Sequence, residues 1–294
     1  MFRMSMTTTI MDGKAVAARI LEGAAERVRV MKDKTGVTPC LATVLVGEDP
    51  ASVTYVRMKR KRCEAVGMTS LKVALPRTTT TGELVERIGR LSDDAGVHGI
   101  LLQHPVPKGI DERLAFEAIS PVKDVDGVTM RSFGAISFDR PEMGYGSCTP
   151  AGMMRLLDAY EVDPSGKHAV VIGRSPILGK PMVMMLLARH ATVTVCHSRT
   201  RDLPELVRQA DILVAAVGRP RFVKGNWVKR GAVVLDAGYN EGNIGDVDFD
   251  AVAERASLIT PVPGGVGPMT IATLIDQTAT AAERQLGGLA KRWV

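Results

Sequence analysis

Short β-branched runs alternate with longer amphipathic stretches along most of this chain, and this alternation limits the possible folds more than any other feature. The predicted strands are 41–46, 71–75, 97–103, 169–172, 192–196, 212–217, 232–236 and 258–260. The predicted helices are 14–31, 50–66, 82–94, 112–119, 150–160, 179–188, 203–209 and 269–286. Strand, helix and strand in this order are typical of parallel sheets with helices on both faces. The sequence therefore predicts an open α/β fold.

Two breaks in the pattern predict two lobes. The stretch 134–146 has the composition of a loop, and Thr149-Pro150 then offers an N-cap and a first-turn proline for a new helix. A second break lies at 261–268, where three prolines and three glycines stand within PVPGGVGP. We expect lobes at 1–148 and 149–268, with the C-terminal helical segment 269–294 packing back on the first lobe.

The composition narrows the class of protein. Hydrophobic residues make up 45% and charged residues 24% of the chain, which is typical of a globular protein and not of a disordered tail. The longest apolar runs, such as 182–188, are far shorter than the roughly 20 residues of a membrane-spanning helix. The first residues hold no apolar signal-peptide core. We expect a cytoplasmic protein that does not associate with membranes.

The cysteines point to the same compartment. Cys40, Cys63, Cys148 and Cys196 are widely scattered and form no CxxC pair. This spacing favours free thiols in a reducing cytoplasm over a disulfide framework or a zinc site. We expect no metal ion.

The excess of basic residues calls for an anionic partner. The net charge is +6, and five of the six residues from 57 to 62, all but Met58, are Lys or Arg. Only 4% of the residues are aromatic, and none lies within this run as in a surface that binds single strands. Small anionic ligands are therefore favoured over nucleic acid. A non-enzymatic anion or RNA binder remains an alternative.

A helix expected to start at Asp49-Pro50 carries the first candidate residues. Ser52, Tyr55 and Lys59 are spaced three and four apart, so they project from one helix face. A hydroxyl, a phenol and an amine on one face suit proton transfer, provided that neighbouring positive charges lower the pKa of the lysine. A solvated basic helix face is the alternative interpretation.

Two further polar groups follow predicted strands and helices. Gln103 and His104 stand at the carboxyl end of an apolar strand, where open α/β sheets bind ligands. The turn Lys123-Asp124-Val125-Asp126-Gly127 lacks the spacing of a calcium loop. A carboxylate that accepts hydrogen bonds from donor groups of a substrate is therefore more plausible than a metal ligand. The structural alternatives are that Gln103 and His104 are polar residues whose hydrogen bonds are completed at the strand end, and that residues 123–127 form a plain Asx turn.

The segment AVVIGRSPILG at 169–179 is a buried strand that leads through a glycine turn into a helix. Backbone amides and the helix dipole can hold a phosphate at such a turn, although the glycines do not follow the usual GxGxxG spacing. The next predicted strand is followed by Ser198 and Arg199 where an NAD enzyme usually places an acidic residue. With Arg174 on the first turn, the pattern predicts NADP over NAD.

Taken together, these motifs identify a family. The chain resembles the bifunctional methylenetetrahydrofolate dehydrogenase/methenyltetrahydrofolate cyclohydrolase enzymes from about residue 12 to 280. The matching motifs are Ser52-x-x-Tyr55-x-x-x-Lys59, Pro76-Arg77-Thr78-Thr79, Gly99-Ile100-Leu101-Leu102-Gln103-x-Pro105, Lys123-Asp124-Val125-Asp126-Gly127, Cys148-Thr149-Pro150, Gly173-Arg174-Ser175, Cys196-His197-Ser198, Gly245-Asp246-Val247 and ITPVPGGVGPMT at 259–270. The last motif is highly specific.

The resemblance implies roles for residues at matching positions. It implies that Lys59 is the catalytic lysine of the cyclohydrolase and that Tyr55 positions the substrate. It also implies that Gln103 assists the lysine and that Asp126 holds the pterin ring. The expected substrate-binding residues are these four together with Ser52, Pro263, Gly264, Gly265, Val266 and Gly267. The expected cofactor-binding residues are Thr149, Gly173, Arg174, Ser175, Ser198, Arg199 and Tyr239.

The resemblance also implies the chemistry and the partners. A folate-binding catalytic lobe and a Rossmann-type NADP-binding lobe surround a cleft, usually in a homodimer of one-carbon metabolism that serves purine biosynthesis. Hydride transfer to NADP turns 5,10-methylenetetrahydrofolate into the methenyl form, which a lysine-assisted water hydrolyses to 10-formyltetrahydrofolate. We further hypothesise that the basic run from Lys59 to Arg62 attracts the glutamate tail of polyglutamylated folate.

Two departures from the family pattern leave alternatives open. His104 stands where the family usually has an aliphatic residue, so it either alters the hydrolase by titrating near Lys59 or packs at the wall of the cleft. Tyr239 replaces the usual isoleucine near the cofactor. A dehydrogenase with a weakened cyclohydrolase is therefore one alternative. Another is a different two-lobed NADP oxidoreductase, such as a shikimate-dehydrogenase-like enzyme.

Overall fold

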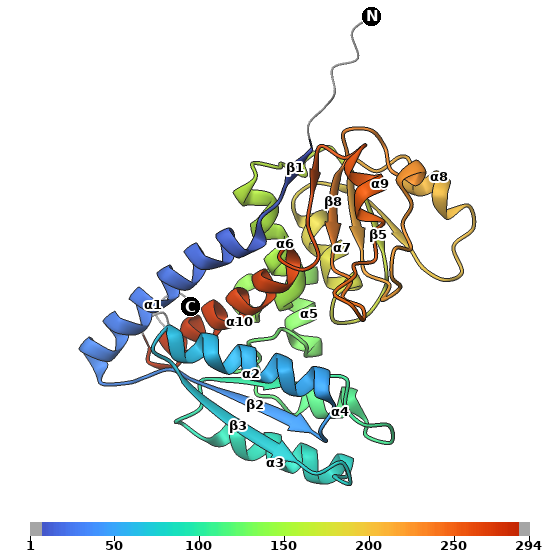
Figure 1. Cartoon of the computed structure of the whole chain (residues 1–294). Helices are drawn as coiled ribbons and strands as arrows, with labels where there is room; N and C mark the ends of the chain where they lie inside the picture. The colour runs from blue at the N-terminus through green and yellow to red at the C-terminus, as the bar shows by residue number, and fades with distance from the viewer. Residues whose placement is uncertain (1–7, 288–294) are drawn as a thin grey trace, which may run out of the picture. The chain divides into compact units, whose positions relative to one another are not determined.

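A computed structural model describes residues 8–287 and divides the chain into two compact α/β units (Figure 1). The first unit comprises residues 8–17 and 149–270, and the second comprises 18–148 and 271–287. The sequence analysis grouped the first residues with the second unit. Residues 8–17 instead group with the first, because Thr9 and Ile10 extend its sheet.

The first unit is built on a six-stranded parallel sheet in the order β1-β9-β8-β7-β5-β6. Its strands are β1 (Thr9–Ile10), β5 (His168–Ile172), β6 (Thr192–Cys196), β7 (Ile212–Ala215), β8 (Val233–Asp236) and β9 (Leu258–Ile259). The chain leaves β5 toward β6 on one side and then returns to β7 on the other side. The point between β5 and β7 is therefore the topological switch point, where open α/β sheets bind ligands.

Helices surround this sheet and enclose its core. They are α6 (Cys148–Ala159), α7 (Gly179–Ala188), α8 (Leu203–Val207) and α9 (Phe249–Ala253), with a short 3₁₀ turn η2 (Gly225–Trp227). Every residue of β7 and β8 is buried, which is why these strands read as continuous apolar runs in the sequence. The core beneath α9 and η2 joins side chains of β5, β7 and β8 with Val223, Val247 and Val252.

The second unit contains a three-stranded parallel sheet in the order β3-β2-β4. Its strands are β2 (Cys40–Val46), β3 (Thr69–Leu75) and β4 (Gly99–Leu102), linked by α2 (Pro50–Ala65) and α3 (Thr81–Asp93). The crossovers run in opposite directions from β2 to β3 and from β3 back past β2 to β4. Right-handed connections therefore place α2 and α3 on opposite faces of the sheet, as Figure 1 shows.

Two long helices complete this unit. Helices α1 (Gly13–Thr35) and α10 (Val266–Gln285) pack with α2 against β2 and β4. Arg27 on α1 joins them, since its guanidinium donates to Asp276 at 2.6 Å and to Glu283 at 2.6 and 2.9 Å. These bonds hold α10 against α1, and they bring its carboxyl-terminal half into the second unit.

The structure confirms the parallel α/β architecture but differs in several elements. The stretch 134–146 holds the end of α5 (Met130–Ser137) and the 3₁₀ turn η1 (Pro141–Met143), where a loop was expected. Thr129 caps α5 by accepting from the Ser132 amide at 3.1 Å. Helix α10 begins before residue 269 because Pro268 occupies its first turn, where no intrahelical N–H is needed. Helix α4 (Glu112–Glu117) lies where a helix was predicted.

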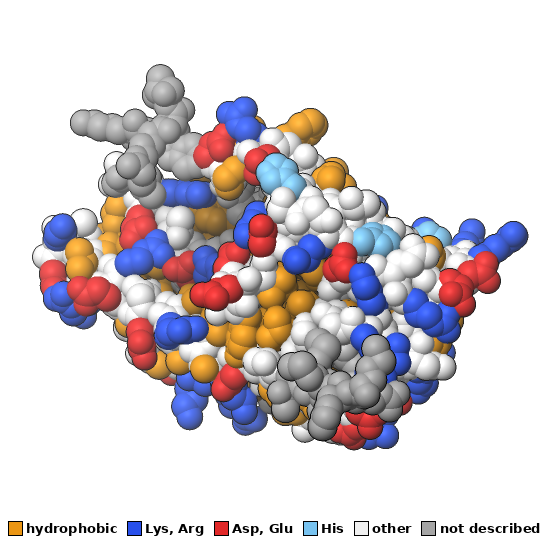
Figure 2. Space-filling view, turned by 90° about the horizontal axis from the view of Figure 1, so that it is seen from above, with side chains coloured by type: hydrophobic (Ala, Val, Ile, Leu, Met, Phe, Trp, Pro, Cys, Tyr) orange, Lys and Arg blue, Asp and Glu red, His pale blue; other side chains and the backbone are white. Residues whose placement is uncertain are grey.

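Basic and acidic side chains are mixed on one face of the molecule, where Lys and Arg are interspersed with Asp and Glu (Figure 2). On α2, Arg60 pairs with Glu64 at 3.1 Å. Within residues 8–287, no helix combines the length and apolar character that crossing a bilayer requires.

Candidate active site

Helix α2 presents the first group of predicted residues. Asp49 caps the helix by accepting from the Ser52 amide at 2.8 Å, and Pro50 occupies the first helical position. Ser52 is buried, whereas Tyr55 and Lys59 are half-buried, so the three predicted residues line the inner side of the helix. Their neighbours Arg57, Arg60, Lys61 and Arg62 are exposed.

Lys59 meets Gln103 as the resemblance implied. The Lys59 ammonium donates to Oε1 of Gln103 at 3.0 Å. Gln103 directly follows β4. Its backbone N–H donates to the Val44 carbonyl at 2.8 Å, and its side-chain Nε2 donates to the carbonyl of His104 at 2.8 Å. Because both ends of its side chain are engaged, Gln103 holds the lysine amine in one place.

Burial lowers the pKa of Lys59 below its ordinary value, and the nearby Asp126, Cys148 and Cys63 oppose this shift. The sequence predicted a lowered pKa for a different reason, namely the positive charges that follow Lys59. The structure gives burial as the main cause, since Arg60, Lys61 and Arg62 extend to the exposed side of the helix. A lysine of this kind loses its proton more easily.

The turn that carries Asp126 is fixed by its two preceding charged residues. Asp124 is fully buried and accepts from the Thr129 hydroxyl at 2.7 Å and the Ser132 hydroxyl at 2.6 Å. The Lys123 ammonium donates to the carbonyls of Leu91 at 3.3 Å and Asp94 at 2.7 Å. Lys123 and Asp124 therefore build the turn, and Asp126 is the half-buried carboxylate of the motif beside Lys59.

Two residues that sequence reasoning did not assign hold the same turn. Nε2 of Gln277 on α10 donates to the carbonyls of Val125 at 2.7 Å and Gly146 at 3.0 Å. The buried Cys148 thiol donates to the Val125 carbonyl at 3.2 Å. Cys148 belonged to a recognised motif, whereas Gln277 gave no local signal because its partners lie more than 100 positions away.

His104 has an aromatic packing partner for its ring. Its ring packs edge-on against Phe116, with centroids 6.4 Å apart, and only its backbone carbonyl bonds to Gln103. This packing favours the structural interpretation of His104 over a change in the hydrolase.

In the first unit, the predicted cofactor residues gather at the carboxyl edge of the sheet. Ile172 and Cys196 are paired neighbours at the ends of β5 and β6. Gly173, Arg174 and Ser175 directly follow β5. Ser198 and Arg199 follow β6 after one intervening residue. The side chains of Arg174, Ser175, Ser198 and Arg199 are exposed. The two turns thus present two guanidinium groups and two hydroxyls side by side.

The turn after β5 requires glycine at both of its ends, because the backbone packs tightly against itself there. Gly173 has φ +133°, and a Cβ there would lie 2.3 Å from the Ala216 oxygen. A Cβ on Gly179, the first residue of α7, would lie 2.4 Å from the Gly173 oxygen. The Ser175 hydroxyl accepts from the Gly179 amide at 3.2 Å. This close backbone approach at a helix N-terminus is the geometry that binds a pyrophosphate.

Tyr239 lies in the turn after β8, where it is exposed and its hydroxyl donates to Oδ1 of Asn243 at 2.5 Å. Thr149 lies at the start of α6 and accepts from the Thr270 hydroxyl at 3.1 Å. Both residues belong to the first unit.

The predicted folate loop also belongs to the first unit, and it is tightly packed. Pro263, Gly264 and Gly265 form the turn, whereas Val266 and Gly267 are the first residues of α10. Gly264 has φ +110°, and its carbonyl accepts from the Lys14 amide at 3.1 Å. A Cβ on Gly265 would lie 2.6 Å from the Pro261 oxygen, so only glycine fits there.

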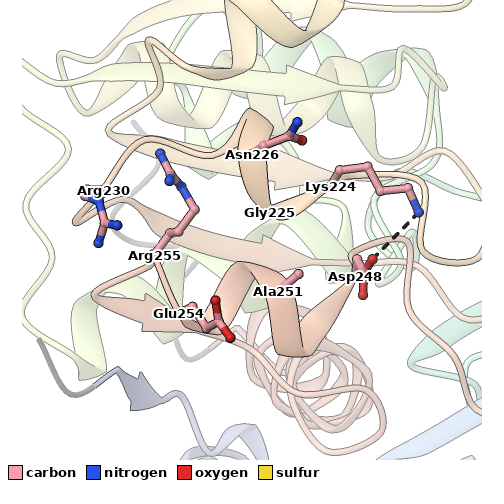
Figure 3. Close-up of a pocket in the computed structure, with 8 residues that line it drawn as sticks. All are labelled: Lys224, Gly225, Asn226, Arg230, Asp248, Ala251, Glu254 and Arg255. Carbon is pink, nitrogen blue, oxygen red and sulfur yellow. Dashed lines mark ion pairs between the residues drawn. The ribbon is translucent and has the colours of Figure 1, made fainter. Parts of the chain in front are cut away.

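A separate pocket lies on the first unit between η2 and α9 (Figure 3). It has a volume of about 520 Å³ and is lined by Lys224, Gly225, Asn226, Arg230, Asp248, Ala251, Glu254 and Arg255. Its charged residues are of both signs, and Lys224 pairs with Asp248 at 3.7 Å. None of the predicted site residues lines it. Among the described residues, no group of His, Cys, Asp and Glu side chains is placed to hold a metal ion.

Family models match both parts of the chain. One, described as the catalytic domain of tetrahydrofolate dehydrogenase/cyclohydrolase, matches residues 11–126. The other, described as the NAD(P)-binding domain of the same enzyme, matches residues 147–286. The chain belongs to the tetrahydrofolate dehydrogenase/cyclohydrolase family. The resemblance inferred from the motifs is thereby confirmed.

Individual members of the tetrahydrofolate dehydrogenase/cyclohydrolase family match nearly the whole chain. A bifunctional protein FolD of Streptomyces avermitilis is 65% identical over 96% of this chain and 98% of its own. The crystal structure of the bifunctional enzyme from Campylobacter jejuni is 47% identical with a TM-score of 0.91, covering 94% of this chain and 99% of its own. The enzyme of Trypanosoma brucei, solved with NADP and an inhibitor, is 37% identical with a TM-score of 0.92, covering 95% and 98%.

The alternative oxidoreductase is a relative in fold only. Shikimate 5-dehydrogenase of Thermus thermophilus has a TM-score of 0.54 at 15% identity, covering 84% of this chain. Both proteins share the open α/β architecture. Membership of the tetrahydrofolate dehydrogenase/cyclohydrolase family decides against a shikimate-dehydrogenase-like enzyme.

Proposed function

We propose that this chain oxidises 5,10-methylenetetrahydrofolate with NADP and hydrolyses the methenyl product to 10-formyltetrahydrofolate, with Lys59 assisting the water. Family membership over both parts of the chain supports the two activities and the cofactor. The observation that carries the role of Lys59 is its contact with Gln103 at 3.0 Å, beside Asp126 and with a pKa lowered by burial.

In the dehydrogenase step, NADP supplies a hydride acceptor for the one-carbon bridge of the folate. The substrate nitrogen stabilises the resulting cation, so the protein has little covalent chemistry to perform. The glycine turn after β5 and the amide end of α7 receive the pyrophosphate. Arg174, Ser198 and Arg199 bind the 2′-phosphate, because guanidinium and hydroxyl groups complement phosphate where a carboxylate would repel it.

In the cyclohydrolase step, water attacks the cationic amidine carbon of the methenyl substrate. Neutral Lys59 accepts one proton from this water and returns it to the ring nitrogen as the bond from that nitrogen to the one-carbon unit breaks. The remaining hydroxyl proton is released to solvent as the formyl C=O forms. Gln103 holds the amine by accepting one of its hydrogen bonds, and Asp126 binds the pterin ring through its donor groups. Ser52 and Tyr55 complete the substrate site on α2, and a role for the 263–267 loop in folate binding rests on the family resemblance.

We also propose that the exposed basic residues of α2 bind the glutamate tail of folate. Lys61 is exposed on the same helix as Lys59. Lys61→Glu is expected to raise the KM for a polyglutamylated substrate severalfold and leave the KM for the monoglutamate nearly unchanged. Lys32→Glu, which makes the same charge change on α1, is the control. Equal effects on the two substrates would refute the proposal.

The family resemblance further supports a homodimer that works in the cytoplasm. Light scattering of the purified chain tests the dimer: a mass near 63 kDa supports it, being twice the 31.5 kDa of one chain. A mass of one chain over the working concentration range would exclude it. Fractionation of the source cells tests the location.

The decisive experiment mixes the protein with 5,10-methylenetetrahydrofolate and either NADP or NAD. Absorbance follows the reduced cofactor and the methenyl compound together. NADPH that forms without methenyl accumulation supports both activities. Methenyl accumulation would instead indicate a weak hydrolase. No reduction with either cofactor would refute the proposed dehydrogenase.

A further inference from the structure

The loop after β7 holds a buried carboxylate in a ring of backbone amides. Three successive amides, those of Val217, Gly218 and Arg219, donate to Asp246 at 2.6, 2.9 and 2.8 Å. Gly218 has φ +63°, which lets consecutive N–H groups converge. Such a concave set of amides is a nest, a common binding site for external anions such as phosphate. In this chain, Asp246 fills the nest from inside.

This arrangement fixes the direction of the loop's carbonyl groups. In a trans peptide, the C=O points opposite to the N–H. Since the three amides point at Asp246, the carbonyls of Ala216, Val217 and Gly218 point away from it. The position of the Ala216 oxygen agrees, because it lies against Gly173 in the turn after β5. The loop thus turns acceptors outward and its donors inward, and the Ala216 carbonyl faces the switch point.

The rest of the first unit is shaped to keep Asp246 in place. Asp236 at the end of β8 accepts from the amides of Asp246 at 3.0 Å and Val247 at 2.9 Å. The Asn240 side chain donates to Asp246 at 3.1 Å. Side chains are excluded around the two carboxylates, since a Cβ on Gly238 would lie 2.3 Å from Asp246 and one on Gly245 would lie 2.0 Å from Asp236.

We propose that Asp246 is a positioning residue for NADP: by filling the nest after β7, it turns the carbonyls of this loop outward, that of Ala216 toward the turn after β5, where they accept hydrogen bonds from hydroxyl or amide donors of the cofactor. The same arrangement denies this loop to phosphate and leaves the pyrophosphate to the turn after β5. The inference rests on NADP being the cofactor. It also explains the Gly245-Asp246-Val247 motif, for which no role was predicted from the sequence.

The test compares Asp246→Asn with Asp248→Asn in the full-length chain. Both changes replace a carboxylate with an isosteric amide, but Asp248 pairs with Lys224 at the separate pocket in Figure 3. Binding of NADP is measured by calorimetry. The cyclohydrolase is assayed with 5,10-methenyltetrahydrofolate in the absence of NADP, because its proposed catalytic residues Lys59, Gln103 and Asp126 belong to the other unit.

Asp246→Asn is expected to raise the Kd for NADP about tenfold or more, because its amide end cannot accept from the converging N–H groups. The cyclohydrolase stays within about twofold of wild type, and Asp248→Asn leaves both quantities nearly unchanged. Equal NADP affinity in the two variants would overturn the inference. Failure of the wild type to bind NADP would instead refute the proposed function.

A second variant covers a failure of Asp246→Asn to fold, which loss of the cyclohydrolase would reveal. Asn240→Ala removes the side-chain donor to Asp246, together with its bond to the Ile244 carbonyl at 3.0 Å, and keeps the three backbone bonds to Asp246. It is expected to raise the Kd for NADP about threefold, in line with the loss of weak hydrogen bonds at the edge of the nest. An unchanged Kd in Asn240→Ala would also overturn the inference.

Discussion

The amine of Lys59 and the amide oxygen of Gln103 lie 3.0 Å apart, and the chemistry of this pair depends on which form the amine takes. Gln103 can accept from either the ammonium or the neutral amine, so it holds the group without a charge of its own. Burial lowers the pKa of Lys59 and thereby enlarges the neutral fraction at a given pH. Only the neutral amine can accept a proton from water. The cyclohydrolase rate should therefore rise with pH until Lys59 is deprotonated, at a pH below the ordinary value of 10.5.

Replacing Lys59 separates the two activities. Lys59→Met is expected to lower the cyclohydrolase kcat at least about a hundredfold, the usual contribution of a general base. The dehydrogenase retains activity, because hydride transfer requires no proton acceptor from the chain. Lys72→Met, at an exposed position on β3, is the control. A cyclohydrolase that survives Lys59→Met within tenfold would contradict the proposed role.

Adding a negative charge at position 103 tests the pKa directly. Gln103→Glu places a carboxylate against the amine, which favours the ammonium form and raises the pKa of Lys59. The rise of the cyclohydrolase with pH is expected to shift to higher pH by about one unit or more. Gln285→Glu is the control, because it also removes a hydrogen bond from a glutamine side-chain amide to a backbone carbonyl, that of His98 at 2.8 Å. Identical pH profiles for the wild type and Gln103→Glu would refute the explanation.

Among the elements, long strands and helices were predictable because burial repeats along their length. All residues of β2, β4, β7 and β8 are buried, so each stood out as an apolar run. The two residues of β1 carry no such pattern and join the sheet only by pairing with β9. Helix α5 contains Gly134, which favoured a loop, but its cap at Thr129 outweighs that preference.

The turn between β5 and α7 depends on glycine more than on any side chain. Gly173→Ala is expected to raise the KM for NADP at least about tenfold and lower the free energy of unfolding, since its Cβ would meet the Ala216 oxygen at 2.3 Å. Gly23→Ala on α1 is the matched control. No atom lies within 4 Å of its added Cβ, so it should stabilise the helix by up to about 1 kcal/mol. Chemical denaturation and dehydrogenase kinetics measure both effects. Equal behaviour of the two variants would contradict the role of the turn.

At the scale of the whole molecule, local motifs predicted site residues that lie within a motif, but not the supporting contacts between segments distant in the sequence. Lys59 and Gln103 were predicted from their own motifs, and the structure brings them together. The support given by Gln277 and Asp246 could not be read from the sequence. Their partners lie on other elements, and the directions of the backbone C=O groups that accept from Gln277 and of the N–H groups that donate to Asp246 leave no pattern in side-chain chemistry.

The pH dependence of global unfolding tests the buried carboxylates of the first unit. Burial raises the pKa of Asp236 from 3.8 to about 6, although the three backbone amides that donate to it oppose the rise. A carboxyl with a raised pKa in the folded state contributes stability that is fully present below pH 3.8 and lost as the pH rises through 6. The wild type should therefore lose on the order of 2 to 3 kcal/mol of unfolding free energy relative to Asp236→Asn between pH 4 and 6. Urea denaturation at several pH values measures this difference, with Asp248→Asn as the control that keeps the wild-type slope. A pH-independent difference between the wild type and Asp236→Asn would show that Asp236 is ionised in the folded chain across this range, and that its bonds to the amides outweigh its burial.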